Sequence, residues 1–303
     1  MVPIAGTLTV TSAACHIPEL WSSKTRDAVE ANVVAAGLVE SSDYGLKELK
    51  GGPGDTMNIP YISNPTANTK TANTNITLEV IGPSSAEASQ SFTVGTHQHV
   101  GFAVENITKV QSKTDLMNKY SGKAGYALGA AADTNLHTLP QSFSQSVGTQ
   151  GVEPTESNWL RAAQYLDDAL APAGERFIIC RPATFYAMQK TNRYTHADYA
   201  GSENARTALE RNRIDRIHNA DVFITTLVRA ASAGQADNWF CHKKGVYYCS
   251  QDMKTNSANV IERDADVFLA THIYGYAEAL QPPVTAGGGA ATDVFNVLVA
   301  GVS

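Results

Sequence analysis

Cysteine is scarce in this sequence, and so is positive charge. Only four of the 303 residues are cysteine, and none of them forms a CxxC pair. Thiols scattered in this way indicate free cysteines in a reducing compartment rather than a disulfide framework. Lysine and arginine number 23 against 29 acidic residues, which gives a net charge of −6. Electrostatic nucleic-acid binders need a basic face, so this balance argues against such a binder but not against a protein that merely encloses nucleic acid.

Long apolar segments are missing as well. No run approaches the roughly eighteen apolar residues that a membrane-spanning helix needs. The N-terminal segment MVPIAGTLTVTSAAC lacks the basic start and the long apolar core of a signal peptide. The sequence therefore predicts neither a membrane-spanning segment nor a secretion signal.

Catalytic signatures are a third absence. The sequence contains no GxSxG, GxxxxGK[ST], HExxH or GxGxxG motif. His97 and His99 share one parity of a predicted strand and would bind a metal ion if a third ligand joined them. Solvated or interface histidines need no such ligand, and this interpretation is favoured. The sequence thus predicts no catalytic residue, no cofactor site and no metal site.

One stretch is unusually polar. Residues 62–79, ISNPTANTKTANTNITLE, are half threonine and asparagine and hold three large apolar side chains. Ordering a backbone residue costs roughly 1–2 kcal/mol, which buried apolar area normally offsets. The flanking segments GDTMNIPYIS and SFTVGTHQHVGFAVE both alternate as strands do. We predict one long hairpin from about Asp55 to Val104, which is marginally stable alone and needs a partner to order its tip.

Two segments have the apolar spacing of helices. The first begins at Pro18, in IPELWSSKTRDAVEANVVAAGLVE, where proline is tolerated in the first turn. The second begins at a capping box formed by Ser112 and Asp115 and ends at Pro140. At about 1.5 Å per residue this second helix would be roughly 40 Å long, which exceeds the usual length. Its predicted packed face consists of Leu116, Tyr120, Ala124, Ala127, Leu128, Ala131 and Leu136.

The remainder alternates between helices and strands, which is typical of a mixed α/β domain. Predicted helices lie at 156–171 and 182–190, and predicted strands lie at 176–180, 220–228, 238–250, 265–280 and 294–303.

Taken in order, these segments resemble the major capsid protein of tailed double-stranded-DNA bacteriophages. Each segment alone is a weak signal, but the ordered set is specific and spans nearly the whole chain. The similar segments are the opening helix at 17–39, the loop entry at 54–63, the loop return with the long helix at 102–136, the strand and proline-started helix at 176–190, and later strands at 238–249 and 271–283.

The resemblance implies an α+β protein with the Johnson fold of phage capsids. It implies an N-terminal arm with a short helix at 1–50 and an extended β-hairpin loop at 51–104. A peripheral domain built on the long spine helix would cover 105–145 and 255–303, and a mixed α/β axial domain would cover 146–254.

The resemblance also implies a structural function. Such a protein self-assembles into hexamers and pentamers that form an icosahedral shell, which encloses the phage double-stranded DNA without sequence-specific binding. An acidic lining suits this role, because each neutralised phosphate would add salt-dependent affinity. The expected location is the virion, after synthesis in the bacterial host cytoplasm. Expected partners are other copies of the chain, a portal and cement proteins, and a separate scaffolding protein, because the fold begins almost at the first residue.

In the family that the sequence resembles, the extended loop lies across a neighbouring subunit. Some members crosslink a loop lysine to a neighbour's asparagine beside a catalytic glutamate; here no matching glutamate can be assigned, so no crosslink is expected. The predicted intersubunit contacts are Trp21, Asn64, Thr66, Lys70, Asn73 and Asn75.

Two alternatives stay open at this stage. An encapsulin-like nanocompartment shell shares the fold but holds cargo proteins in place of DNA. A metal-dependent enzyme using His97 and His99 is the more distant alternative. A β-rich tail or surface protein is disfavoured by the long helix.

Overall fold

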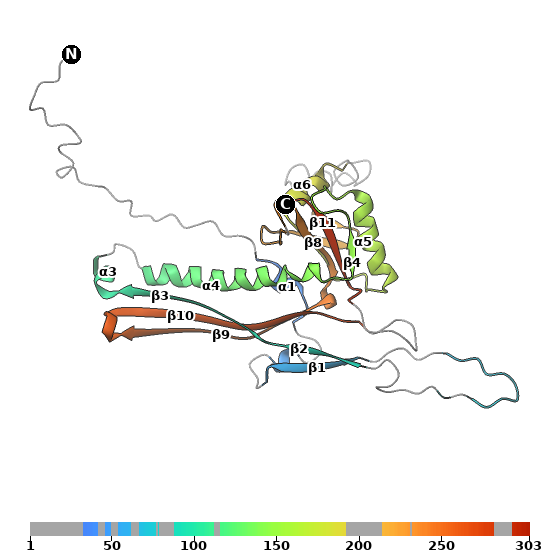
Figure 1. Cartoon of the computed structure of the whole chain (residues 1–303), viewed down its shortest axis with the longest axis horizontal. Coiled ribbons are helices and arrows are strands. Elements are labelled where there is room, and N and C mark those ends of the chain that lie inside the picture. Colours follow the sequence, from blue (N-terminus) through green and yellow to red (C-terminus); the bar gives the residue numbers. More distant parts are fainter. Residues whose placement is uncertain are drawn as a thin grey trace, which may run out of the picture.

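The computed structural model describes ten parts of the chain: 33–41, 46–49, 54–61, 67–76, 78, 88–111, 116–191, 214–230, 232–281 and 293–303. Within these parts the fold is α+β, as predicted, with sheets of two, three and six strands. Figure 1 shows the three-stranded sheet and the long helix α4 extending away from the six-stranded sheet, which lies with helices α5 and α6.

The long helix α4 spans Leu116–Leu136, with the short helix α3 (Asn106–Gln111) before it. Its 21 residues correspond to roughly 31 Å, which is shorter than predicted. Pro140 belongs to a separate turn of 3₁₀-helix, η2 (Leu139–Gln141), because proline cannot continue the α-helical bonds. The predicted capping box of Ser112 and Asp115 lies outside the described residues.

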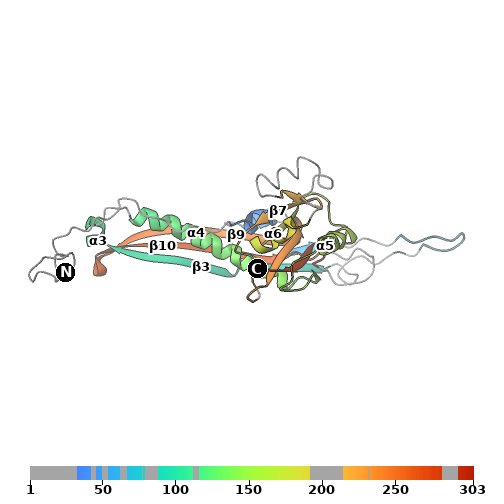
Figure 2. The same cartoon turned by 90° about the horizontal axis from the view of Figure 1, so that it is seen from above.

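One face of α4 packs on the three-stranded sheet, and the two views agree on this arrangement (Figures 1 and 2). The buried positions repeat every four residues, at Ala124, Leu128, Ala132 and Leu136. The prediction that Ala127 lies on the packed face is wrong, because that residue is exposed. So many positions of this helix are alanine that apolar spacing alone does not identify the ridge that enters the sheet.

The three-stranded sheet has the order β3-β10-β9 and is antiparallel. Its strands are β3 (Thr96–Glu105), β10 (Ala265–Glu278) and β9 (Val246–Val260). Alternate side chains of β3 and β10 face α4, where Phe102 stacks on Phe268 with ring centroids 5.0 Å apart.

The two-stranded sheet is shorter than the hairpin predicted from Asp55 to Val104. It pairs β1 (Thr56–Tyr61) with β2 (Ala88–Thr93). The strand is interrupted at Val94 and Gly95. The next strand, β3, then pairs with β10 and does not continue the hairpin.

Gly275 of β10 leaves room for the chain where the strand is interrupted. A Cβ atom at Gly275 would lie 2.5 Å from the Thr93 carbonyl oxygen and 2.9 Å from Val94 Cα. Only glycine therefore lets the chain cross β10 here on its way from β2 to β3.

The six-stranded sheet has the order β4-β11-β8-β5-β7-β6. The helices α5 (Glu156–Asp168) and α6 (Pro182–Gln189) bury apolar side chains against it. The strands are β4 (Gln145–Val147), β5 (Arg176–Cys180), β6 (Arg216–Ile217), β7 (Ala220–Ile224), β8 (Ala236–His242) and β11 (Asn296–Gly301).

Two predicted domain boundaries do not follow the strand pairing. The last strand, β11, was expected with the peripheral domain, but it pairs with β4 and β8 in the six-stranded sheet. The strand β9 runs through the predicted boundary at 254/255 as one continuous strand. The segment 238–250 does hold two strands, β8 and β9, but they belong to different sheets, and the 3₁₀ turn η3 (Lys243–Gly245) separates them.

Candidate intersubunit surfaces

The tip of the hairpin lies far from the rest of the described chain, at the right of Figure 1. Its residues 67–76 are all exposed, and so is Leu78. A turn shapes the tip: Asn73 has a left-handed φ of 64°, and the Thr74 hydroxyl donates to the Thr71 carbonyl oxygen at 2.7 Å. Asparagine tolerates that conformation better than most residues, so the local sequence favours the turn.

Three of the predicted contact residues, Lys70, Asn73 and Asn75, lie in this tip and are exposed. The other three, Trp21, Asn64 and Thr66, lie outside the described residues. Beside them Ile76 and Leu78 expose 68% and 85% of their surface. The tip thus presents hydrogen-bonding side chains and two apolar ones to whatever covers it.

The base of the hairpin is built quite differently, because it encloses a small apolar core. A two-stranded sheet is marginal alone in water, and this one is anchored by buried residues from three other segments. Phe92 is fully buried, with its ring 6.3 Å from that of Tyr247 in an edge-to-face contact. We call this cluster the hairpin-base core; its buried members are Leu46, Leu49, Ile59, Phe92, Val94, Tyr247, Cys249 and Ala279.

A second exposed apolar surface lies at the far end of the three-stranded sheet. Ile261 is 89% exposed in the 3₁₀ turn η4 (Ile261–Arg263) between β9 and β10, and Ile107 of α3 is 59% exposed. The Asn106 side chain donates to the Asp264 carboxylate at 2.6 Å, and its backbone N–H donates to the Asp264 carbonyl oxygen at 2.9 Å. These bonds hold the start of α3 against the turn, so this end of the sheet carries two exposed isoleucines. Sequence reasoning missed this surface because the pairing of β3 with β10 was not predicted.

The N-terminal segment is fastened to the spine helix by one buried carboxylate. Asp133 of α4 is fully buried and accepts backbone N–H groups from Val34 at 3.2 Å and Ala36 at 3.0 Å. His137, one turn further along, is also fully buried and lies 3.5 Å from the same carboxylate. Asp133 thereby holds the start of helix α1 (Ala35–Leu38), the described part of the helix predicted from Pro18.

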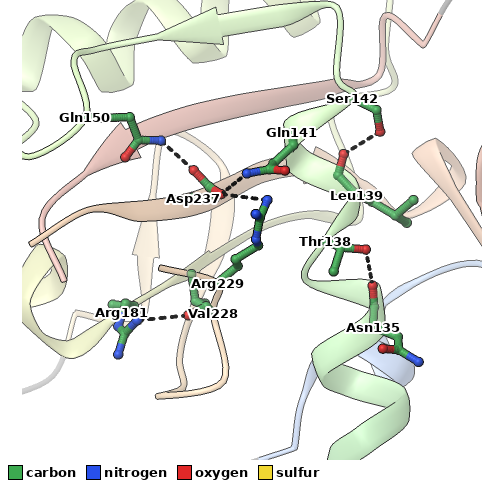
Figure 3. A network of polar contacts seen from close by, with 10 residues as sticks. All are labelled: Asn135, Thr138, Leu139, Gln141, Ser142, Gln150, Arg181, Val228, Arg229 and Asp237. Atoms are coloured by element: carbon green, nitrogen blue, oxygen red, sulfur yellow. Dashed lines mark hydrogen bonds and ion pairs between the residues drawn. The ribbon is translucent and has the colours of Figure 1, made fainter. Parts of the chain in front are cut away.

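A polar network joins the end of the spine helix to the six-stranded sheet (Figure 3). At its centre Asp237 of β8 is 1% exposed. Its carboxylate accepts from the side chains of Gln141 in η2, at 3.3 Å, and Gln150 in the loop after β4, and it pairs with Arg229 at 3.9 Å. Because the carboxylate is shared by three separate segments, it fixes the spine-helix end relative to the sheet.

The carboxyl group of Glu278, the last residue of β10, is partly buried. Glu278 accepts a hydrogen bond from the Ser142 hydroxyl. Burial raises the pKa of Glu278 above its ordinary value of 4.5, and the nearby Asp293 raises it further, while the Ser142 bond lowers it. This group is thus easier to protonate than an exposed glutamate.

The two histidines considered as metal ligands lie on one face of β3, as their spacing predicts. His97 and His99 are both exposed, and they point away from the side covered by α4. In the described part of the chain, no three side chains among His, Cys, Asp and Glu lie close enough together to hold a metal ion. Within the same residues, no helix is both long and apolar enough to span a membrane.

Solved capsid structures share this architecture. A structure from Mycobacterium phage Che8 is similar with a TM-score of 0.75 at 19% identity, over 93% of this chain and 96% of that one. The capsid structure of the cyanophage P-SCSP1u gives a TM-score of 0.71 at 10% identity, over 93% and 92% of the two chains. The mature capsid of bacteriophage PhiM1 gives 0.67 at 12% identity, again over 93% and 92%.

The likeness is therefore one of structure. No protein-family model and no curated protein matches the sequence. The chain has the fold of phage capsid structures along nearly its whole length, which confirms the Johnson fold that the sequence resemblance implied.

Proposed function

We propose that this chain is the major capsid protein of a tailed double-stranded-DNA bacteriophage. In this role it self-assembles into hexamers and pentamers of an icosahedral shell around the genome. The observation that carries the proposal is the match to capsid structures over more than nine-tenths of the chain. The proposed location is the virion, after synthesis in the cytoplasm of the host.

The energetics of the hairpin support assembly. Ordering the ten tip residues 67–76 costs on the order of 10–20 kcal/mol of backbone entropy, and all ten are exposed in the single chain. Apolar burial cannot offset that cost within the subunit. A neighbouring subunit that covers the tip would supply the missing contacts, and a shell repeats such a contact at every position.

The apolar end of the three-stranded sheet supports the same conclusion. The Asn106–Asp264 bonds join the segments of Ile107 and Ile261, and both side chains stay exposed. Removing apolar surface from water is worth roughly 25 cal/mol per Å², so these side chains would stabilise a contact between copies. We further propose a separate scaffolding protein, a portal and cement proteins as partners, with the DNA enclosed and not read.

Expression of the chain, alone and with its scaffolding protein, followed by electron microscopy tests the proposal. We expect closed particles of uniform size that protect DNA from nuclease after packaging. Particles that hold only cargo proteins would identify a nanocompartment shell instead. A monomer that forms no particle under either condition would contradict a shell function.

A hairpin replacement makes the test specific. Replacing residues 64–89 with a short Gly-Ser turn should leave a soluble, folded subunit that forms no closed shell, because the hairpin-base core keeps all of its buried members. Normal shells from this variant would show that the tip is not an intersubunit contact. The double variant His97→Ala, His99→Ala is a matched control, since it alters exposed residues outside the hairpin and should assemble normally, also with EDTA.

A further inference from the structure

The hairpin is attached to the body by contacts of two kinds. Strands β1 and β2 form a sheet of their own, so no ladder of backbone bonds continues into β10 or β9. The hairpin-base core supplies apolar contact, which is strong but non-directional. The direction in which the hairpin leaves the body must therefore be fixed by hydrogen bonds, which have a defined geometry.

Gln90 of β2 makes two such bonds with a single side chain. Its Nε2 group donates to the Glu278 carbonyl oxygen, and its Oε1 atom accepts the Leu280 backbone N–H at 2.9 Å. Glu278 is the last residue of β10, and Leu280 lies two residues after it, on the body of the subunit. The planar amide thereby bonds to alternate residues of the chain, as the backbone of a neighbouring strand would.

A weaker bond holds the other strand. The Gln251 side chain of β9 donates to the Gly54 carbonyl oxygen at 2.9 Å, just before β1 begins. That bond is exposed, so water competes for both of its partners, whereas Gln90 is partly buried. Of the two, the amide of Gln90 is therefore the stronger restraint.

The length of the hairpin amplifies any rotation at its base. The six residues of β1 (Thr56–Tyr61) alone extend about 20 Å. A rotation of about 10° at the base would move the far end of β1 by roughly 3.5 Å, which exceeds the length of a hydrogen bond. The tip contacts a neighbour reproducibly only if the direction is fixed to within a few degrees.

We propose that Gln90 is the positioning residue that sets the direction of the hairpin and, through it, the curvature of the shell. Only the effect on shell curvature rests on the proposed shell function. The direction of the hairpin strands β1 and β2 is a property of the single subunit and is measured without assembly.

The distance between the hairpin strands and the body can be measured by pulsed electron spin resonance on the full chain. Spin labels at Asn58→Cys in β1 and Asp168→Cys at the end of α5 would occupy exposed positions. The background carries Cys15→Ser, and the three described cysteines are buried and so protected from labelling.

Three variants then separate direction from stability. Gln90→Met keeps the length of the side chain and loses both bonds, so the distance distribution should become at least twice as wide as in the parent. Gln90→Glu keeps the acceptor and loses the donor, and should give an intermediate width. Thr56→Val is the matched control, because the Thr56–Thr93 hydroxyl bond of 3.2 Å lies within the hairpin; its width should not change.

The outcomes for the subunit are decisive. An unchanged width in Gln90→Met would overturn the proposal. If both Gln90 variants failed to fold, as seen by thermal unfolding, the residue would be a general stabilising one and the proposal would again be wrong. A broad distribution at an unchanged Tm supports it.

Assembly provides the second readout. Shells of Gln90→Met should vary in diameter, whereas those of Thr56→Val should match the parent. Uniform shells from a subunit with a broad distribution would overturn the link to curvature. If the parent forms no shells at all while the widths behave as expected, the proposed function fails and the role of Gln90 in the subunit stands.

Discussion

Replacing Asp133 with alanine should free the N-terminal segment from the spine helix. The substitution leaves the backbone N–H groups of Val34 and Ala36 without their acceptor. An unsatisfied buried donor costs about 1–3 kcal/mol, so about 2–6 kcal/mol is lost if α1 stays in place. Release of α1 avoids that penalty but exposes the buried Ala35 and Val39, at about 1.5–3 kcal/mol for the valine alone. The loss should therefore be about 2–4 kcal/mol.

Differential scanning fluorimetry and hydrogen exchange check this estimate. A loss of that size corresponds to a fall in Tm of roughly 3–6 °C for a chain of 303 residues, with faster exchange at Val34 and Ala36. Asp133→Asn keeps one acceptor oxygen and should show about half the effect. Thr134→Ala is the control, since that exposed hydroxyl bonds only within the helix, to the Ala130 carbonyl oxygen. An unchanged Tm and unchanged exchange in Asp133→Ala would refute the reasoning.

Three further outcomes are expected. Because burial raises the pKa of Glu278, ionisation of this group opposes folding as the pH rises. Glu278→Gln should therefore raise the Tm at pH 7 and change it little near pH 4. Equal changes in Tm at the two pH values would contradict this. Leu128→Ala should cost about 2–5 kcal/mol in chemical denaturation, whereas Ala127→Leu on the exposed face should be nearly neutral; similar losses would mean that the packed face is wrong. Shells boiled in reducing SDS should run as one band near 32.3 kDa, and a ladder abolished by Lys70→Ala would reveal crosslinks.

The local elements of the axial region were predictable because their signals are short-range. The strand at Arg176–Cys180 holds four consecutive apolar residues, from Phe177 to Cys180, after a glycine-containing loop, and Pro182 starts α6 at its first position. Proline is favoured there because its fixed φ suits a helix and its missing N–H would have no partner. Such signals do not depend on the rest of the fold.

Strand partners were not predictable from the same reasoning. Alternation in 96–105 indicates correctly which side chains face the core, but the same parity suits any partner strand. The crossing at β10 needs the space left by Gly275, which lies 180 residues after Gly95 and has no local sequence signal for this role. The last strand, β11, was likewise expected in the peripheral domain, although it pairs with β4 and β8.

The candidate intersubunit surfaces were also only partly predictable from the sequence. The exposed tip was predictable, because its composition cannot form a core and Lys70, Asn73 and Asn75 are polar. The anchors were not: the Asp133 bonds connect residues 97 and 99 positions apart, and the Gln90 bonds connect residues 188 and 190 positions apart. A glutamine or an aspartate with a structural partner so distant looks like any surface residue in the sequence.

The three anchored surfaces follow one physical rule. Helix α1, the hairpin and the apolar end of the sheet are each held by side-chain bonds, which come from Asp133, Gln90 and Asn106 respectively. Apolar burial decides whether such a segment stays attached, but only hydrogen bonds with defined geometry decide where it points. A subunit that must meet several neighbours at fixed angles needs rigid roots and can leave the far ends to be stabilised by contact. Loss of an anchor should therefore change the geometry of assembly before it abolishes folding, and this order of failure distinguishes anchors from core residues such as Leu128.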